Sequence, residues 1–362
     1  IGGGLVGSLA AIALFKKNYK VLVIEKRKQI AKDDRTLAVN ANSRNFLKDL
    51  NLWANLENEQ EHISKIIIKD FINKENLTFQ NAQESMGSVI FNKTLLKITR
   101  DFLKKNKIVI DGVDSTQLNI RPKSIINVNN KNFYFKKIIL SLGKNYTDTE
   151  KFKKTEFNSK HKAYVGFLNH QKNHNQIAYE IFTPHGPLAV LPSPSSKKNY
   201  STFIYSTKNQ INYKTLSNLI TKNFQPSHGK IKIKKSLSSF SINPHISMPI
   251  QKDFIMIGDA AHSIHPVAGQ GWNLGIKDIQ TLINHLEKYE IDDKNFDKVY
   301  FSKRSIENIS YLTFTSFLNF LYESKQPLSK LIIQASFSVL NRLPILKNLF
   351  IKQAMGKINL VG

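Results

Sequence analysis

Three glycines at the start of the chain restrict its fold more than any other feature. Gly2, Gly4 and Gly7 have the G-x-G-x-x-G spacing, and a stretch rich in Ala and Leu that is typical of a helix follows them. An apolar run then ends in Glu25, 18 residues after Gly7. Such glycines permit a tight turn and the close approach of a pyrophosphate to a helix N-terminus, and the acid can accept hydrogen bonds from a ribose. The pattern predicts a dinucleotide site and disfavours a phosphorylated ribose.

A second glycine-rich stretch, residues 258–275, follows a short apolar run that predicts a buried strand. Gly258 allows close backbone approach, and Asp259 can accept hydrogen bonds from sugar hydroxyls. Gly269 and Gly271 let the loop turn into a predicted helix, whose first amides can stabilise negative charge. Because this stretch lies more than 200 residues after Glu25, we expect one long dinucleotide held at two points, which favours FAD over NAD.

The composition excludes several classes of protein. The chain has no cysteine, so disulfides, thiolate zinc sites and cysteine nucleophiles are ruled out. The net charge of +26 favours contact with anionic lipid or acidic partners, but lysine is scattered along the whole chain and no aromatic-plus-basic RNA motif occurs. We therefore expect no nucleic-acid function. No apolar run approaches the roughly 18–20 residues that span a bilayer.

The pattern along the chain predicts an α/β protein with a second lobe. We expect residues 1–62, 92–150 and 242–300 to form a discontinuous FAD-binding domain, and residues 63–91 and 151–241 to form a β-sheet lobe that binds the substrate. A glycine turn normally follows a strand, so we also expect a few residues to have been lost before Ile1.

Smaller features of this pattern leave alternatives open. A helix over 92–106 is predicted to turn Lys93, Lys97, Arg100 and Lys104 outward. The proline-punctuated segment 181–192 predicts either a rigid apolar wall for a flat substrate or an ordinary strand with prolines at its ends. The basic, amphipathic region 301–362 predicts either a helical cap on the core or a membrane-surface element.

Other chemistries find little support. His262 with His265, and His170 with His174, lack the three or four converging ligands that zinc needs, so no metal site is predicted. The chain contains no G-x-S-x-G elbow and no phosphate-binding G-x-x-x-x-G-K-[ST] loop. A serine hydrolase and P-loop phosphoryl transfer are therefore not supported.

Together these motifs resemble a known family. The first glycine motif with Glu25, Arg35 before Leu37-Ala38, the segment 182–192 and the stretch 258–275 resemble the ubiquinone-biosynthesis hydroxylases, which are class A flavoprotein aromatic monooxygenases. The resemblance runs from residue 1 into the tail, at 341–356. It implies a Rossmann-like FAD-binding domain of the p-hydroxybenzoate hydroxylase type, with an inserted antiparallel sheet lobe and C-terminal helices.

The resemblance also implies a mechanism and a set of site residues. NAD(P)H reduces FAD, oxygen adds to form a flavin C4a-hydroperoxide, and an oxygen atom passes to the ring of a polyprenylated phenol or quinol. The flavin-edge loop would include Pro266, Gly269 and Gln270. The residues implied to bind the cofactor are Gly2, Gly4, Gly7, Glu25, Arg35, Gly258, Asp259, Gly271, Trp272 and Asn273.

The sequence departs from the family in one important place. The family usually has Ala-Asp-Gly after its middle strand, in contact with FAD and NAD(P)H, whereas this chain reads Ser141-Leu142-Gly143 without the acid. A different reductant is therefore conceivable. The alternatives are a flavoprotein reductase or epoxidase acting on isoprenoid lipids, and a degenerate flavin-binding scaffold in a quinone-synthesis complex. The resemblance implies a cytoplasmic enzyme peripheral to the inner membrane, with other ubiquinone-biosynthesis proteins as candidate partners.

Overall fold

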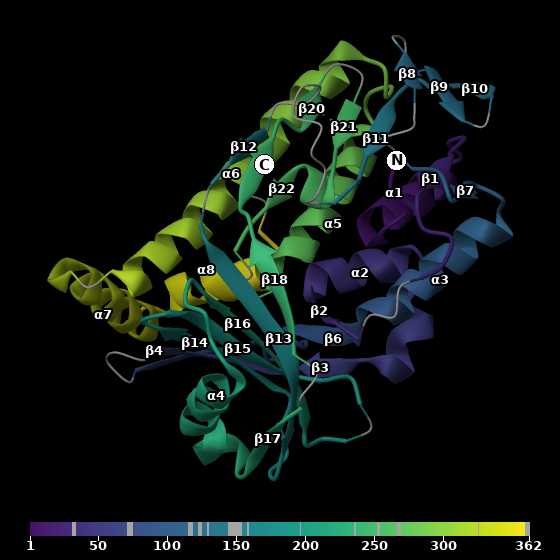
Figure 1. Ribbon diagram of the computed structural model, residues 1–362. Helices are drawn as coiled ribbons and strands as arrows, with labels where there is room; N and C mark the ends of the chain where they lie inside the picture. Colours follow the sequence, from purple (N-terminus) through teal and green to yellow (C-terminus); the bar gives the residue numbers. More distant parts are fainter. Residues whose placement is uncertain are drawn as a thin grey trace.

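In the computed structural model, the glycine-rich start of the chain forms the turn and helix that its spacing predicts. The structure describes residues 1–30, 34–70, 75–114, 119–121, 125–128, 130–143, 154–157, 159–195, 197–234, 237–251, 254–265, 269–324 and 326–358. Figure 1 shows helices packed around short parallel strands, a large sheet below them, and a long helical arm along one side.

The helices begin where the sequence supplies caps or prolines. The side chains of Asn40 and Asn212 accept hydrogen bonds from the backbone of the first turn of α2 and α4, and prolines begin α7 and α8. The helices are α1 (Leu5–Lys16), α2 (Ala41–Asp49), α3 (Asn92–Lys105), α4 (Tyr213–His228), α5 (Gln270–His285), α6 (Lys294–Glu323), α7 (Pro327–Arg342) and α8 (Pro344–Ala354), with short 3-10 helices η1 (Trp53–Glu59) and η3 (Gly258–Ala260).

The strands around the glycine turn are short, and several of them are parallel. They are β1 (Val23–Glu25), β2 (Thr36–Asn40), β3 (Glu61–Ile63), β6 (Gly87–Phe91), β7 (Val109–Asp111), β8 (Asn119–Arg121), β9 (Ile125–Val128), β10 (Lys131–Tyr134), β11 (Ile138–Leu140), β20 (Ile250–Gln251), β21 (Phe254–Met256) and β22 (His262–Ser263). The β1–β7 and β11–β21 pairs are both parallel, so the chain returns to parallel pairing at β11.

The first two residues connect these two parallel pairs. The Gly2 amide donates to the Ile24 carbonyl at 2.9 Å, and the Ser141 amide donates to the Ile1 carbonyl at 2.8 Å. A cavity of about 480 Å³ lies between α1 and the strands on either side of this bridge. The glycine turn is thus held from both sides by backbone hydrogen bonds.

The second lobe is one large sheet built from two distant parts of the sequence. Its strands, with those of a small adjoining sheet, are β4 (Lys65–Asp70), β5 (Asn76–Gln80), β12 (Lys154–Glu156), β13 (His161–His170), β14 (Ile177–Thr183), β15 (Gly186–Pro192), β16 (Tyr200–Thr207), β17 (Ile231–Ile233), β18 (Ser238–Ile242) and β19 (His245–Ser247). The eight-stranded sheet has the order β17-β13-β16-β15-β14-β4-β5, and β18 also pairs with β13. β6 lies within residues 63–91, which were expected in the lobe, but it pairs with β2 and β3 and not with the large sheet.

One side chain lies opposite to its predicted direction. Arg100, expected to face solvent, is buried between α3 and the nucleotide-binding strands. It forms an ion pair with Asp111 of β7, and its Nη2 donates to the Arg27 carbonyl at 3.1 Å. Helical periodicity could not predict this, because the carboxylate that compensates the buried charge lies on a different element.

Three histidines form a buried cluster in the lobe, beside the C-terminus of α4. The rings of His170 and His228 are 4.6 Å apart, and His174 lies 6.3 Å from His170. Burial, together with the neighbouring histidines, lowers the pKa of both His174 and His228 to about 4. Within the described ranges, no group of three or more His, Asp or Glu residues has the arrangement of a metal site.

This cluster predicts a loss of stability in acid. Between pH 7 and pH 5 the unfolded chain protonates His174 and His228, but the folded chain does not, so the free energy of unfolding falls by on the order of 2 kcal/mol per histidine. Urea unfolding at the two pH values should show a smaller fall for H174Q/H228Q than for the wild type. The exposed His62 supplies the control variant H62Q, and an unchanged fall in the double variant would contradict the prediction.

Candidate flavin site

The three glycines of the first motif have different roles. Gly2 has φ +99°, and a Cβ there would lie 2.3 Å from the Ser141 carbonyl oxygen. A Cβ on Gly7 would lie 2.0 Å from the Gly2 carbonyl oxygen, so α1 packs directly against the turn. A Cβ on Gly4 would meet no described atom within 4 Å. Two glycines are therefore required by packing, and the third borders the open space at the N-terminus of α1, where a pyrophosphate fits.

Glu25 lies at the end of β1, as the spacing predicts, and closes over this turn. Its Oε2 accepts from the Gly3 amide at 2.5 Å, and its Oε1 accepts from the Arg27 amide at 2.8 Å. Each carboxylate oxygen has a second acceptor position, so ribose hydroxyls can still be bound.

The second motif begins with a tight turn at η3. Gly258 has φ +60°, and its amide donates to Asp278 Oδ2 at 2.7 Å. His245 Nε2 donates to the Asp259 carbonyl at 2.9 Å and fixes the turn from the other side. The Asp259 carboxylate is exposed and has no hydrogen bond or ion pair within the described part of the chain. It is therefore available to hydroxyl groups of a ligand.

Val6 of α1 joins the two glycine motifs. A Cβ on Gly258 would lie 3.1 Å from Val6 Cγ1, and a Cβ on Gly275 of α5 would lie 2.9 Å from Val6 Cγ2. Since both positions lack a side chain, α1 and α5 approach closely with one valine between them. The structure thus brings together residues that are about 250 positions apart in the sequence, and one long ligand can contact both motifs.

The loop before α5 ends at Gly269, in the left-handed conformation with φ +62°. α5 begins at Gln270, and a Cβ on Gly271 would meet no described atom within 4 Å. The first amides of α5 have no partners within the helix, which makes this end electropositive. Pro266, predicted at the flavin edge, lies outside the described residues.

Asn273 holds the α5 N-terminus against β2. Its Oδ1 accepts from the Asn40 amide at 3.0 Å, and its Nδ2 donates to the carbonyls of Ala38 and Gly269 at 2.8 and 3.1 Å. The side chain is thus used within the protein, and only the backbone amide is left for a cofactor. The indole Nε1 of the neighbouring Trp272 is buried without a partner among the described residues.

Arg35 directly precedes β2, and its guanidinium stacks over the ring of Phe240 of β18, 5.2 Å from the centroid. The Arg35 side chain therefore reaches from the nucleotide-binding region to the lobe. Its contact with the cofactor stays a prediction.

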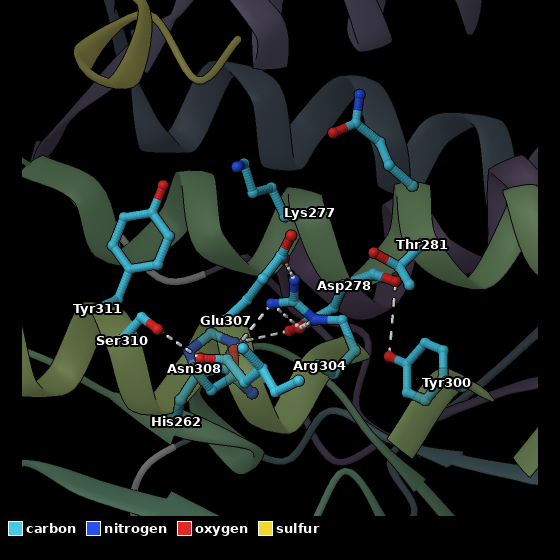
Figure 2. A network of polar contacts seen from close by, with 12 residues as sticks. His262, Lys277, Asp278, Thr281, Tyr300, Arg304, Glu307, Asn308, Ser310 and Tyr311 are labelled. Carbon is cyan, nitrogen blue, oxygen red and sulfur yellow. Dashed lines mark hydrogen bonds and ion pairs between the residues drawn. The ribbon is translucent and has the colours of Figure 1, made fainter. Parts of the chain in front are cut away.

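A buried ionic network beneath η3 and α5 was not predicted from the sequence (Figure 2). Asp278 of α5 accepts from His262 Nε2 at 2.8 Å and pairs with Arg304 of α6 at 2.6 Å. Arg304 also pairs with Glu307 and donates to Asn308 at 2.8 Å. Burial opposes ionisation, yet Arg304 and His262 hold the pKa of Asp278 below its usual value. His262 therefore orients Asp278.

These features fit FAD. The open face at Gly4 and Glu25 would hold the adenosine and pyrophosphate end. The free carboxylate of Asp259 would bind the ribityl hydroxyls, and the open first turn of α5 at Gly271 would face the flavin.

Comparison with known proteins agrees with this fit. Residues 141–292 match a family model described as an FAD-binding domain, and residues 1–48 match one described as an NAD(P)-binding Rossmann-like domain. A ubiquinone hydroxylase from Rhodospirillum rubrum is 25% identical and is aligned over 99% of this chain and 89% of its own length. The mitochondrial ubiquinone-biosynthesis monooxygenase COQ6 of Drosophila melanogaster is 23% identical over 98% of this chain and 89% of its own length.

Solved structures confirm the predicted fold. The p-nitrophenol 4-monooxygenase PnpA of Pseudomonas putida has a TM-score of 0.77 at 15% identity and covers 98% of this chain and 96% of its own. HpxO of Klebsiella pneumoniae, complexed with FAD and uric acid, has a TM-score of 0.74 at 15% identity and covers 100% and 96%. With the relatives above, these matches confirm the resemblance inferred from the motifs.

The two glycine environments predict different effects of the same substitution. G4A should leave the free energy of unfolding of the FAD-free protein within about 1 kcal/mol of wild type and weaken FAD binding at least about tenfold, because the new methyl group enters the open face. G7A should destabilise the FAD-free protein itself by about 2 kcal/mol or more. Flavin fluorescence titration and urea unfolding measure the two effects, and normal FAD affinity in G4A would contradict this assignment.

The network predicts a strong coupling between α5 and α6. R304M leaves the Asp278 charge buried with only His262 and the Gly258 amide as partners, so the free energy of unfolding should fall by about 3–5 kcal/mol. In R304M/D278N the fall should be clearly smaller than the sum of the two single effects, as a double-mutant cycle measures. K298M, on the exposed face of α6, is the matched control. Additive effects would show that the pair is not coupled.

Proposed function

We infer from this geometry and these relatives that the chain is an FAD-dependent aromatic-ring hydroxylase of the ubiquinone-biosynthesis type, and that it acts on a polyprenylated phenol or quinol. The observation that carries the inference is the match to ubiquinone hydroxylases over nearly the whole chain. The flavin site agrees with it, because the space beside Gly4 and Gly271 is open to a ligand, whereas Gly2 and Gly7 pack against the backbone. Bound FAD supplies the electron transfer and oxygen activation.

The residues of this chain provide position and electrostatics. Glu25 and the glycine turn fix the adenosine end, while Asp259 fixes the ribityl chain. The N-terminal amides of α5 stabilise negative charge on the flavin ring. Asn273 holds that end of the helix against β2 by hydrogen bonds, so the amides are aligned before the cofactor binds.

An apolar wall supports a prenylated substrate. The ring of Phe182, at the end of β14, stacks on Tyr322 of α6 with centroids 4.3 Å apart. Ala189 and Leu191 of β15 and Met355 belong to the same buried cluster. The proline-punctuated segment 181–192 thus forms strands of the central sheet and also one side of an apolar junction with α6. We assign the ring and prenyl chain of the substrate to this junction.

NAD(P)H is the proposed source of electrons. The Rossmann-like match at residues 1–48 supports nicotinamide chemistry in this family. The usual acid is absent at Leu142, so the nicotinamide must be held without it. The test is anaerobic addition of NADH or NADPH to the FAD-loaded protein with a short 2-prenylphenol present. Bleaching of the flavin bands and a hydroxylated product after oxygen is admitted are expected, while flavin that stays oxidised with both nucleotides would exclude them as reductants.

We propose that α7, α8 and the end of α6 form a membrane-docking surface. α7 lies at one edge of the molecule (Figure 1), and Leu331 of α7 and Ile345 of α8 are 61% and 80% exposed. Other exposed apolar side chains between residues 314 and 350 are Phe314, Phe317, Phe320, Leu328, Val339, Leu343, Leu346, Leu349 and Phe350. Lys330, Arg342 and Lys352 lie among them. An apolar surface edged by cations suits an anionic bilayer. No helix in the described residues is long and apolar enough to cross one.

Vesicle binding tests this surface. I345S/L349S should bind phosphatidylglycerol-containing vesicles at least about tenfold more weakly than wild type, because each large side chain contributes about 1.5 kcal/mol or more on burial. Added salt should weaken binding of the wild type as well. Y134S, which changes an exposed aromatic on the distant strand β10, is the control. Equal binding by the wild type and I345S/L349S would exclude this surface.

A further inference from the structure

A polar cluster joins the flavin loop, the lobe and the C-terminal arm, and the proposed cofactor contacts do not use it. His161, at the start of β13, donates from Nε2 to Glu323, the last residue of α6. Lys208, just after β16, pairs with the other oxygen of Glu323 at 2.7 Å. The ring of His265, which follows β22 in the flavin loop, lies edge-on to His161 with centroids 4.7 Å apart.

The arrangement leaves one nitrogen of His161 available. Burial opposes ionisation of Glu323, but the hydrogen bonds from His161 and Lys208 lower its pKa to about 2, so Glu323 is a carboxylate that accepts the Nε2 proton. In the neutral ring, Nδ1 is then an acceptor. The His161 side chain is only 3% exposed, and Nδ1 has no hydrogen-bond partner among the described residues. A buried acceptor without a partner is unfavourable, and a hydrogen bond from a bound hydroxyl group would satisfy it.

The position of the cluster suits a substrate hydroxyl. Tyr322, the neighbour of Glu323, stacks on Phe182 of β14, so the end of α6 contacts both the apolar wall and His161 of β13. His265 lies within the glycine-rich loop assigned to the flavin. Burial, with smaller contributions from His161 and Lys208, lowers the pKa of His265 to about 4, so His265 stays neutral and does not compete for a proton near neutral pH.

We propose that His161, oriented by Glu323, is the base that accepts the phenolic proton of the substrate, an inference that rests on the proposed function. The phenolic O–H bond breaks and an Nδ1–H bond forms, which leaves a phenolate and an imidazolium paired with Glu323. The phenolate is the more electron-rich ring and accepts an oxygen atom more readily. The proton returns to the product oxygen afterwards, so no proton is consumed. The groups facing His161 are His265 from the loop, Glu323 from α6 and, through Glu323, Lys208.

The test measures ionisation of a bound phenol without turnover. A short 2-prenylphenol is added to the oxidised, FAD-loaded protein across a pH series, and the near-ultraviolet difference spectrum reports phenolate. The free phenol ionises near pH 10, as tyrosine does. Bound to the wild type, the phenol should ionise at least about one pH unit lower than the free phenol. Bound to H161Q, it should show no such lowering. Unchanged ionisation in H161Q would overturn the proposal.

Turnover gives an independent readout. H161Q should lose about 100-fold in kcat with 2-prenylphenol, but less than about tenfold with a polyfluorinated 2-prenylphenol that is already ionised at the assay pH. An equal loss with both substrates would indicate a structural role and contradict the proposal. E323Q keeps the ring of His161 but removes its carboxylate partner. This variant should show a smaller loss of kcat than H161Q, again larger with 2-prenylphenol than with the fluorinated phenol. H185Q, at an exposed histidine of the lobe, is the matched control.

The two proposals fail in different ways. If the wild type forms no hydroxylated product with either phenol, the proposed function fails, whatever the ionisation shows. If the product forms and the bound phenol ionises equally in wild type, H161Q and E323Q, only the role of His161 is refuted. FAD content and urea unfolding of each variant confirm that the folded, loaded protein is being compared.

Discussion

The buried charge of Asp278 is the constraint on which the flavin site depends. At 1% side-chain exposure, this carboxylate is stable only because Arg304, His262 and the Gly258 amide all bind it. Those three partners belong to α6, β22 and η3, so one buried anion fixes the C-terminal arm, the loop and the tight turn relative to α5 (Figure 2). Because an unpaired charge at this depth costs several kcal/mol, these elements must assemble together.

Close backbone packing then joins the two halves of the cofactor site. Val6 fits between Gly258 and Gly275, and Asn273 bonds three backbone groups across β2 and the loop. These contacts are short and leave no space for another side chain, so the relative position of the adenosine end and the flavin end is fixed by the apoprotein. Preorganisation of this kind reduces the ordering cost of binding a long, flexible ligand.

The residues after α8 extend this order to the surface proposed to dock on a membrane. The Lys277 ammonium donates to the Ile358 carbonyl at 2.8 Å, and the Asn42 amide donates to the Met355 carbonyl at 3.0 Å. Met355 is fully buried against the lobe. The end of α8 is therefore anchored to α5 and α2, beside the flavin site, while the outer faces of α7 and α8 remain exposed. A substrate that leaves a bilayer there would have a short path to the apolar junction.

The local elements and the positions of the glycine turns follow from the amino-acid sequence alone. The spacing of Gly2, Gly4 and Gly7, the acid at Glu25 and the loop before α5 predicted the fold class and FAD, because glycine requirements and helix N-termini are local properties. Which charges are buried depends on contacts between distant elements: helical periodicity places Arg100 outward, and Asp278, Arg304 and the His161–Glu323 pair give no signal in the sequence. Their partners lie 11, 26 and 162 residues away, and burial depends on contacts between elements that no local pattern records.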